Sequence, residues 1–381
     1  MRLLAFGSYD AEAHPRVAVL LEGLRRHGVT VEECNEPLRL DTAARVRLLQ
    51  QPWRLPRLLG ELARVWWVLV RGARRATRPD VVLVGYLGHF DVLLARLLFR
   101  GTPIVHDMLV FASDTARDRG AGGLKQRLLA SLDAAAVRAS DVVVVDTEEH
   151  LGLLPAQRRA DGVVVPVGVP AAWTAPAPER RPDDAPVRVV FYGLYTPLQG
   201  APVIGRALAL LRDEPRVRVT MVGTGQDLAA ARRAAGERDG VDWLDWVAPA
   251  DLPALVADHD VCLGIFGRGE KALRVVPNKV FQGAASGCAV VTSDTAPQRR
   301  ALGDCAVLVP PGDPEALATA LRDLAADRDR LQALRTGAWT LARERFVPEA
   351  VVVPLLERVT MPAVPRPGPD RPAAPSIEDH T

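Results

Sequence analysis

Short apolar runs rich in Val alternate with helical patterns along most of the chain. The runs lack the polar alternation of a half-exposed strand, which is typical of parallel strands that helices cover on both faces. The runs in the first half are residues 2–7, 29–34, 80–86, 102–107, 141–146 and 162–168, and those in the second half are 187–193, 217–223, 241–247, 260–266, 288–294 and 306–312. The pattern therefore predicts an α/β protein built on parallel sheets.

This alternation stops near residue 171 and resumes at 187. The stretch between, AAWTAPAPERRPDDAP (171–186), is rich in Pro and charge and has no periodicity, which indicates a linker. Two β/α arrays of similar size flank it, so we predict two Rossmann-like, doubly wound domains, 1–170 and 187–345, facing a central cleft. We expect a C-terminal helix over 346–360 and a disordered, Pro-rich tail over 361–381.

One predicted helix, residues 53–78, differs from the others in its charge. Apolar residues such as Leu62, Trp66 and Leu69 recur at helical spacing, while Arg71 and Arg75 fall on the opposite side. The helix either packs on its own domain as an ordinary surface helix or lies on an anionic membrane surface with Trp66 or Trp67 at the interface. The sequence leaves both interpretations open.

Composition limits the partners and the compartment. A net charge of +2 on 48 basic and 46 acidic residues gives no global basic field, so nucleic acid is not an expected partner. The first residues, MRLLAFG, do not form a signal peptide, and no apolar run reaches the roughly 18 residues of a membrane span. The four cysteines form no CxxC pair. We expect a cytoplasmic protein that meets the inner membrane face, if at all, through residues 53–78.

The stretch EKALRVVPNKVFQ (270–282) contains Lys271 and Lys279, two of only three lysines in the chain. Pro277 suits the first position of a helix, so Lys279 falls in the first turn. A cation there is unfavourable unless an anion is bound, in which case the free N–H groups and the ammonium both donate to it. The alternative is two solvated surface lysines. A location at the carboxyl edge of an open α/β sheet favours a phosphate site.

Five stretches of the second half carry a family resemblance. They are FYGLYTPLQG, MVGTGQDL, LDWVAPADLPALVADHDVCLGIF, PNKVFQGAASGCAVVTSDTAPQRRAL and AVLVPPGDPEALATAL. In order and spacing they resemble the nucleotide-binding domain of family 4 (group 1) glycosyltransferases of the GT-B fold, and the resemblance extends over the chain to about residue 360. It implies transfer of a sugar, with retention, from a nucleotide-diphosphate sugar to an acceptor hydroxyl. No DxD-like metal motif stands out, so we expect no metal and no other cofactor.

The resemblance implies a donor site at the helix PNKVFQ, with Lys279 and Lys271 as catalytic cations. The other implied donor contacts are Arg274, Asn278, Gln282, Gly193, Gly223, Gly225 and Val247. The family usually has two Glu spaced E-x7-E, and here those positions are Arg274 and Gln282. An amide still accepts one ribose hydroxyl without charge, whereas Arg274 would hold phosphate. The loop GLYTPLQG also lacks the family's usual Arg and Lys, so positive charge for the diphosphate would come from Lys271, Arg274 and Lys279.

In the first half, the resemblance implies that His106, at the end of the strand TPIVHD, lies at the cleft rim and contacts the transferred sugar. Asp107 would orient His106 or bind the acceptor. The loop GSYDAEAHPR supplies the remaining acceptor candidates, namely Gly7, Ser8, His14 and Arg16, and the stretch VGYLGHFD supplies Tyr86 and His89 as weaker ones. Each also has an ordinary structural interpretation, a satisfied buried histidine or a surface loop.

Three other functions compete with sugar transfer. A nucleotide-sugar epimerase shares the architecture, and the exchanges at Arg274 and Gln282 suit a binding or partner subunit that has lost catalysis. A dinucleotide dehydrogenase is least favoured because MRLLAFGSYDAEAH lacks G-x-G-x-x-G after the first strand. The acceptor, whether a glycan, a metabolite or a lipid-linked saccharide, has no signal in the sequence, and neither do the donor base and sugar.

Overall fold

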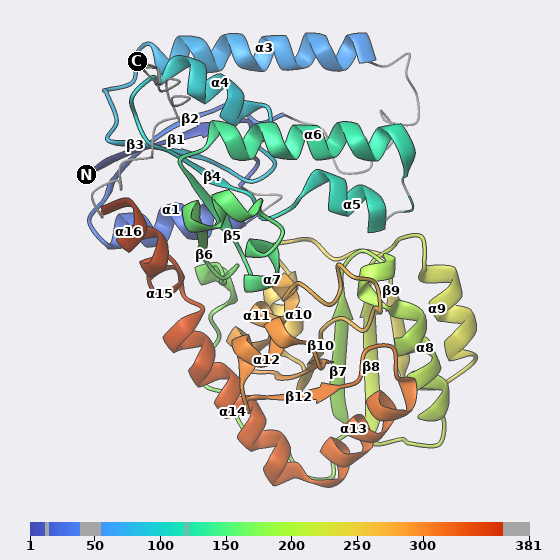
Figure 1. Cartoon of the computed structure of the whole chain (residues 1–381). Coiled ribbons are helices and arrows are strands. Elements are labelled where there is room, and N and C mark those ends of the chain that lie inside the picture. The colour runs from blue at the N-terminus through green and yellow to red at the C-terminus, as the bar shows by residue number, and fades with distance from the viewer. Residues whose placement is uncertain (12–14, 39–54, 119, 121, 361–381) are drawn as a thin grey trace, which may run out of the picture.

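The computed structural model describes residues 1–11, 15–38, 55–118, 120 and 122–360 as two α/β domains, one above the other in Figure 1. Each domain is built on one six-stranded sheet, and every strand pair in both sheets is parallel. The predicted fold class is therefore confirmed. Each apolar run identified from the sequence overlaps one of the strands, and only β2 extends past its run, by the single residue Asn35.

The first sheet has the order β2-β1-β3-β4-β5-β6. Its strands are β1 (Arg2–Gly7), β2 (Thr30–Asn35), β3 (Val81–Val84), β4 (Ile104–Asp107), β5 (Val142–Val145) and β6 (Gly162–Val164). The helices of this domain are α1 (Arg16–Arg26), α3 (Leu55–Ala73), α4 (Asp91–Leu98), α5 (Ala112–Asp118), α6 (Gly123–Ala139) and α7 (Glu148–Leu151), followed by the 3-10 turn η2 (Ala156–Asp161).

The second sheet has the order β12-β11-β10-β7-β8-β9. Its strands are β7 (Val187–Tyr192), β8 (Val217–Val222), β9 (Val241–Leu244), β10 (Val261–Leu263), β11 (Ala289–Ser293) and β12 (Ala306–Val309). Its helices are η4 (Pro197–Gln199), α8 (Ala201–Leu210), α9 (Leu228–Ala235), α10 (Leu252–Ala257), α11 (Asn278–Ala285), α12 (Ala296–Leu302), α13 (Pro314–Ala326) and α14 (Arg328–Arg345).

Helices cover both faces of the central strands, and β3, β4, β5, β10 and β11 are buried throughout, which explains why these sequences show no polar alternation. The edge strands β2 and β9 are partly exposed. In the first domain α3, α4 and α6 cover one face and α1 covers the other. In the second domain α8, α9 and α13 cover one face, and α10, α11 and α14 cover the other. The carboxyl ends of both sheets are left to loops, where ligands bind in such folds.

Residues 171–186 connect the domains and are tied closely to the second one. After the turn η3 (Ala171–Trp173), the buried ring of Trp173 stacks on Tyr192 with a centroid separation of 5.7 Å. Arg181 then pairs with Asp258 at 3.2 Å and with Asp260 at 2.9 Å. The connection predicted from composition thus follows a defined path along the second domain.

The C-terminal residues cross back to the first domain (Figure 1). The single helix predicted for 346–360 is instead two short ones, α15 (Pro348–Val351) and α16 (Val353–Thr360), because Pro354 favours a new helix start over continuation of the old one. Val352 and Leu355 are buried in the core of the first domain. Residues 361–381, for which we predicted disorder, lie outside the described residues.

The helix predicted over 53–78 is α3, which ends at Ala73, five residues earlier than expected. Residues 53 and 54 lie outside the described part. Val65 and Leu69 are buried against the first sheet, and Trp66 donates its indole N–H to Asp91 at 3.3 Å. The side of α3 that carries Val65, Trp66 and Leu69 therefore packs on its own domain, as the first of the two interpretations predicted. Trp67 points away from the core and is exposed.

Candidate functional site

The strand order of the second sheet reverses between β7 and β10, so the loops after these two strands leave in opposite directions. A crevice for a ligand forms at such a switch point, outside the carboxyl ends of the strands. The loop after β7 runs from Gly193 to Gly200, and the segment after β10 leads into α11. The stretch PNKVFQ therefore lies where the resemblance places the donor.

Lys279 is the second residue of α11, in its first turn as predicted. Pro277 is the N-cap, one position earlier than expected. The Lys279 side chain is only 4% exposed, and its Nζ donates to Oε1 of Gln199 at 2.5 Å. The same ammonium lies 3.8 Å from the centre of the Phe191 ring. Lys279 is thus a buried cation between an amide and an aromatic face.

None of the carboxylates in the described residues forms a salt bridge with Lys279. Burial is the larger influence and lowers the pKa of Lys279 to about 7, while the neighbouring Cys262 acts in the opposite direction. A buried ammonium without an anionic partner is costly, and an isolated one tends to lose its proton instead. An anion placed at the start of α11 would restore the charge, because the helix N–H groups and the ammonium both donate to it.

Three glycines bring backbone close to this position. A Cβ on Gly193 would stand 3.4 Å from Nζ of Lys279. A Cβ on Gly223 would stand 2.0 Å from the carbonyl oxygen of Gly193, and one on Gly225 would stand 2.6 Å from the backbone of Tyr195. A larger residue at Gly223 or Gly225 would push these loops apart, whereas Gly193 has room for a Cβ but a φ of +136° that favours glycine. The three glycines therefore have a structural role in the loops after β7 and β8, whether or not they also touch a donor.

The remaining donor candidates of the second domain lie near α11. Asn278 is exposed at the first position of the helix. Gln282 is buried one turn later, and its Oε1 accepts from the Tyr192 hydroxyl at 2.9 Å. Val247 follows β9 and packs against the core cluster that contains Val222. The amide oxygen of Gln282, which we expected to accept a ribose hydroxyl, already has a protein donor.

Lys271 and Arg274 have partners in the first domain, on the helix α5. Nζ of Lys271 donates to the Thr115 hydroxyl at 2.9 Å. Arg274 forms an ion pair with Asp114 and a longer one, 3.4 Å, with Glu270. The three cations predicted to converge on one anion are therefore divided in this structure. Lys279 faces its own domain, while the other two bridge the domains.

His106 is the third residue of β4 and is fully buried, so it does not reach the cleft rim as we expected. Its ring meets His89 edge-on with a centroid separation of 5.6 Å. Burial lowers the pKa of His106 to about 3, so the imidazole is neutral, and neither ring nitrogen has a hydrogen-bond partner among the described residues. Nε2 of His89 in turn lies 3.1 Å from the carboxylate of Asp133. That carboxylate accepts from the backbone N–H groups of Ala112 and Ser113, in the first turn of α5.

Asp107 does not orient His106, because neighbouring residues of a strand point to opposite faces. Its carboxylate instead pairs with Arg16 at 3.2 Å, and both side chains are buried. Arg16 also donates to the carbonyl oxygen of Pro166. The guanidinium that we expected to meet an acceptor phosphate is thus neutralised inside the first domain.

The loop after β1 is bound to α4. The amide and the hydroxyl of Ser8 both donate to Asp91, at 2.8 and 2.7 Å. A Cβ on Gly7 would stand 3.0 Å from the same carboxylate. Gly7 and Ser8 therefore have a structural role in this conformation. His14, the remaining acceptor candidate, lies outside the described residues.

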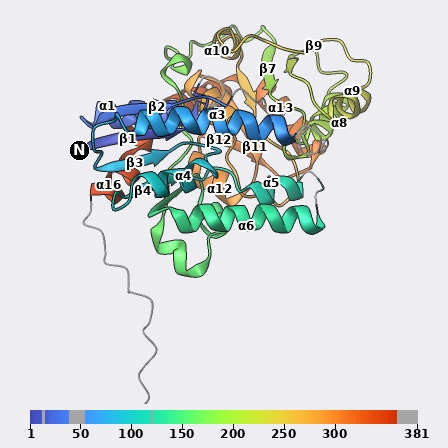
Figure 2. The ribbon, with the colours of Figure 1, turned by 90° about the horizontal axis from the view of Figure 1, so that it is seen from above.

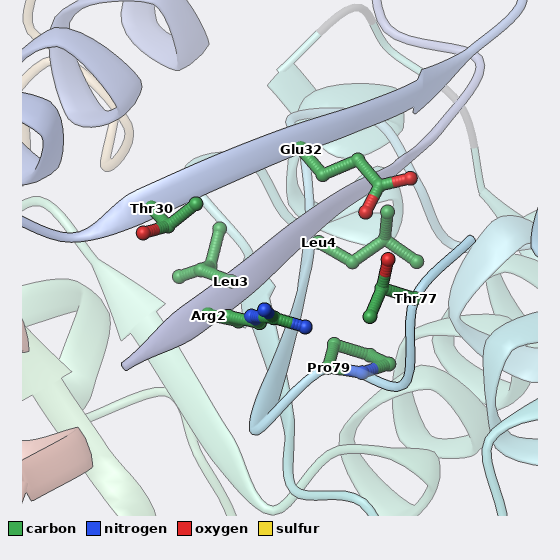
Figure 3. Close-up of a pocket in the computed structure, with 7 residues that line it drawn as sticks. All are labelled: Arg2, Leu3, Leu4, Thr30, Glu32, Thr77 and Pro79. Atoms are coloured by element: carbon green, nitrogen blue, oxygen red, sulfur yellow. The ribbon is translucent and has the colours of Figure 1, made fainter.

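A pocket of about 200 Å³ lies at the amino ends of the strands of the first sheet (Figure 3). It is lined by Arg2, Leu3, Leu4, Thr30, Glu32, Thr77 and Pro79. Arg2 and Thr30 are the first residues of β1 and β2, so the pocket faces away from the carboxyl ends. Within the described residues no cluster of three or more His, Cys, Asp or Glu is arranged to hold a metal ion.

Two family models match the chain. The model described as glycosyl transferases group 1 matches residues 186–327, and the glycosyl transferase 4-like domain matches residues 12–169. The chain belongs to the group 1 glycosyltransferases. No curated protein matches it.

Solved structures of other glycosyltransferases show the same fold over nearly the whole chain. HepE from Anabaena, solved in complex with UDP, has a TM-score of 0.65 at 16% identity, covering 94% of this chain and 99% of that one. Sucrose-phosphate synthase from Thermosynechococcus elongatus has a TM-score of 0.67 at 16% identity, covering 94% and 98%. The glycosyltransferase described here therefore has the GT-B fold, as the resemblance implied.

Sequence analysis missed the partners of the cations in this glycosyltransferase. Gln199 accepts a hydrogen bond from Lys279, but its loop, GLYTPLQG, stood out in the sequence only because it lacks Arg and Lys. Asp114 and Thr115 contact Arg274 and Lys271, which lie 160 and 156 residues away along the chain. The stretch FASDTARD contains small and polar residues of the kind found in many surface turns and short helices. No sequence signal marked it.

Proposed function

We propose that this glycosyltransferase binds a nucleotide-diphosphate sugar with the diphosphate at Lys279 and the first turn of α11. The observation that carries the proposal is the buried ammonium of Lys279, which has a neutral amide, an aromatic ring and a helix N-terminus around it. A diphosphate supplies the missing negative charge and accepts from the free N–H groups of the helix. Two structures of similar fold were solved with UDP and with UDP-glucose, so UDP is the first nucleotide to test.

The proposed reaction transfers the sugar with retention of configuration. The bond between the anomeric carbon and the diphosphate oxygen breaks, and the acceptor oxygen bonds to that carbon from the same face. The departing phosphate takes the acceptor proton, and the nucleoside diphosphate leaves. Fixed positive charge at the phosphate lowers the barrier, because negative charge develops there in the transition state. In this proposal Lys279 supplies that charge within the second domain.

The contacts between α5 and the segment after β10 bridge the two domains, and the proposal gives these contacts a role in donor binding. Asp114 and Thr115 hold Arg274 and Lys271 across the domain boundary. If these contacts open to admit the donor, both cations become available to its phosphates, and closure then excludes water from the reacting bond. His106 is neutral, and its ring nitrogens have no hydrogen-bond partner in the described part of the chain, so it would be available to a sugar hydroxyl if the packing against His89 opened.

The testing experiment is calorimetric titration of the chain with UDP, GDP, dTDP and CDP. It is repeated on Lys279→Met and on Lys125→Met, a matched variant of an exposed lysine. One nucleotide should bind, and Lys279→Met should weaken it by about tenfold to a hundredfold, as for loss of a hydrogen bond from a charged group. Lys125→Met should bind like the wild type. Equal binding by all three proteins would contradict the role of Lys279.

Two competing functions have distinct outcomes. A chain that binds no nucleotide would be better described as a non-catalytic partner subunit, consistent with Arg274 and Gln282 at the positions of the family's usual Glu pair. A chain that binds a nucleotide sugar and converts it without any acceptor would behave as an epimerase. Sugar transfer requires that nucleotide release from the donor depend on an added acceptor, whether glycan, metabolite or lipid-linked saccharide.

A further inference from the structure

Three helices form the outer layer on one side of the first domain. Figure 2 shows α3, α4 and α6 side by side over this layer. Their inner sides contribute Val65, Ala95 and Ala136 to the same core cluster. Their outer sides face solvent and bring together segments that are far apart in the sequence. We call this outer surface the helical face.

Most of the exposed charges of the helical face are positive. They include Arg71, Arg74, Arg75, Arg78, Arg100, Lys125 and Arg127, on the three helices and the turns that follow α3 and α4. The acidic residues of the same helices and turns, within the described part, are Glu61, Asp80, Asp91 and Asp133, and of these only Asp80 is exposed. Asp91 and Asp133 are buried and bonded to Ser8 and Ser113. A chain of net charge +2 thus concentrates basic charge on one side.

Large apolar side chains lie among these cations, one or more from each helix. Trp67 is 59% exposed, Leu128 is 62% exposed and Leu124 is 74% exposed, and Leu97 of α4 is exposed as well. The guanidinium of Arg71 lies 4.6 Å from the centre of the Trp67 ring. Exposed Trp and Leu among cationic side chains suit the boundary between lipid headgroups and acyl chains, because the rings and methyl groups enter while the charged ends stay at the phosphates.

We propose that the helical face binds the surface of an anionic lipid bilayer, with α3 lying in the plane of the interface. Complementary charge supplies the attraction, and the apolar side chains of all three helices supply insertion. A nucleic acid would use the cations without any need for exposed Trp67, Leu124 and Leu128. None of the helices in the described part of the chain combines the length and apolarity that crossing a bilayer requires. This proposal goes beyond sugar transfer and does not depend on it.

The test is cosedimentation of the full chain with vesicles of phosphatidylcholine alone or with about one third phosphatidylglycerol, each at low and high salt. The wild type should bind only the anionic vesicles. Arg71→Gln with Arg74→Gln and Arg75→Gln should weaken binding by about a hundredfold, because each basic residue near an anionic surface contributes a factor of about five. Arg206→Gln with Arg212→Gln and Arg218→Gln removes the same charge from exposed positions of the second domain and should leave binding unchanged.

Trp67→Ser with Leu128→Ser separates lipid insertion from simple charge attraction. It should abolish the part of vesicle binding that survives high salt, while retention on a heparin column, which measures charge alone, stays the same. Failure of the wild type to bind anionic vesicles at low salt would overturn the proposal. Two outcomes would overturn it in favour of a nonspecific polyanion surface. One is an equal loss of vesicle binding in the two arginine triples, and the other is that Trp67→Ser with Leu128→Ser changes neither heparin retention nor vesicle binding.

Discussion

Arg16 in the first domain and Lys279 in the second are both buried cations in the first turn of a helix, but their environments differ. Arg16 has the carboxylate of Asp107 at 3.2 Å and a backbone carbonyl, whereas Lys279 has the amide of Gln199 and the ring of Phe191. A buried cation with an anionic partner keeps its charge within the protein, whereas one without such a partner either loses its proton or gains an anion from a ligand. Burial and helix position alone therefore do not identify an anion site, because the partner of the cation decides.

The largest effect should come from breaking the satisfied pair. Arg16→Met leaves the carboxylate of Asp107 buried without a counter-charge, which should cost about 3–5 kcal/mol of stability. Urea unfolding followed by circular dichroism measures the loss, with the exposed Arg206→Met as control. The double variant Arg16→Met, Asp107→Asn should recover much of it, since no buried charge remains. A loss below about 1 kcal/mol would mean that Asp107 is not held as a charged group.

Lys279→Met should act in the opposite sense on stability. In the folded chain the pKa of Lys279 is lowered from 10.5 to about 7, so between these pH values the unfolded state binds one more proton. Stability of the unliganded wild type should therefore rise with pH over this window by about 1.4 kcal/mol per unit relative to the variant. Below pH 7 the full cost of the buried ammonium is present, and the variant should be the more stable protein.

The protonation of Lys279 should also make nucleotide affinity depend on pH. A diphosphate favours the charged ammonium, so nucleotide affinity of the wild type should fall as the pH rises above 7. The affinity of Lys279→Met should lack this dependence. Calorimetry at several pH values measures both. A parallel decline in the two proteins would assign the titration to the nucleotide or to another residue.

The smallest effect concerns Tyr192, whose hydroxyl donates to Gln282 beside the same helix. Tyr192→Phe removes that bond and should cost about 1 kcal/mol of stability, as for a typical neutral hydrogen bond. It also frees the amide oxygen of Gln282 for a ribose hydroxyl, so nucleotide affinity should hold steady or increase slightly. A marked drop in affinity would show that the Tyr192 hydroxyl itself contacts the donor.

Much of this architecture was predictable because the signals are local. Val-rich runs without polar alternation located the strands, and the Pro and Lys spacing of PNKVFQ placed Lys279 in a first helical turn. The route of residues 171–186 was not predictable, because Trp173 and Arg181 are held by groups far away in sequence. The partition of the three cations was missed for the same reason, since Arg274 is held by a carboxylate 160 residues distant.

Periodicity, helix-start chemistry and motif spacing are properties of neighbouring residues, so the fold class, the two-domain organisation, the family resemblance and the candidate phosphate helix were predictable from the chain alone. Which of the candidate cations remain without an anionic partner became apparent only from the folded structure. Arg16 and Asp107 neutralise each other, and Lys271 and Arg274 bridge the domains. Lys279 is buried, and its hydrogen-bond partner in the described part of the chain is an amide and not a carboxylate. Whether a charge is satisfied depends on what lies within a few ångströms of it, and folding brings those groups together from distant parts of the chain.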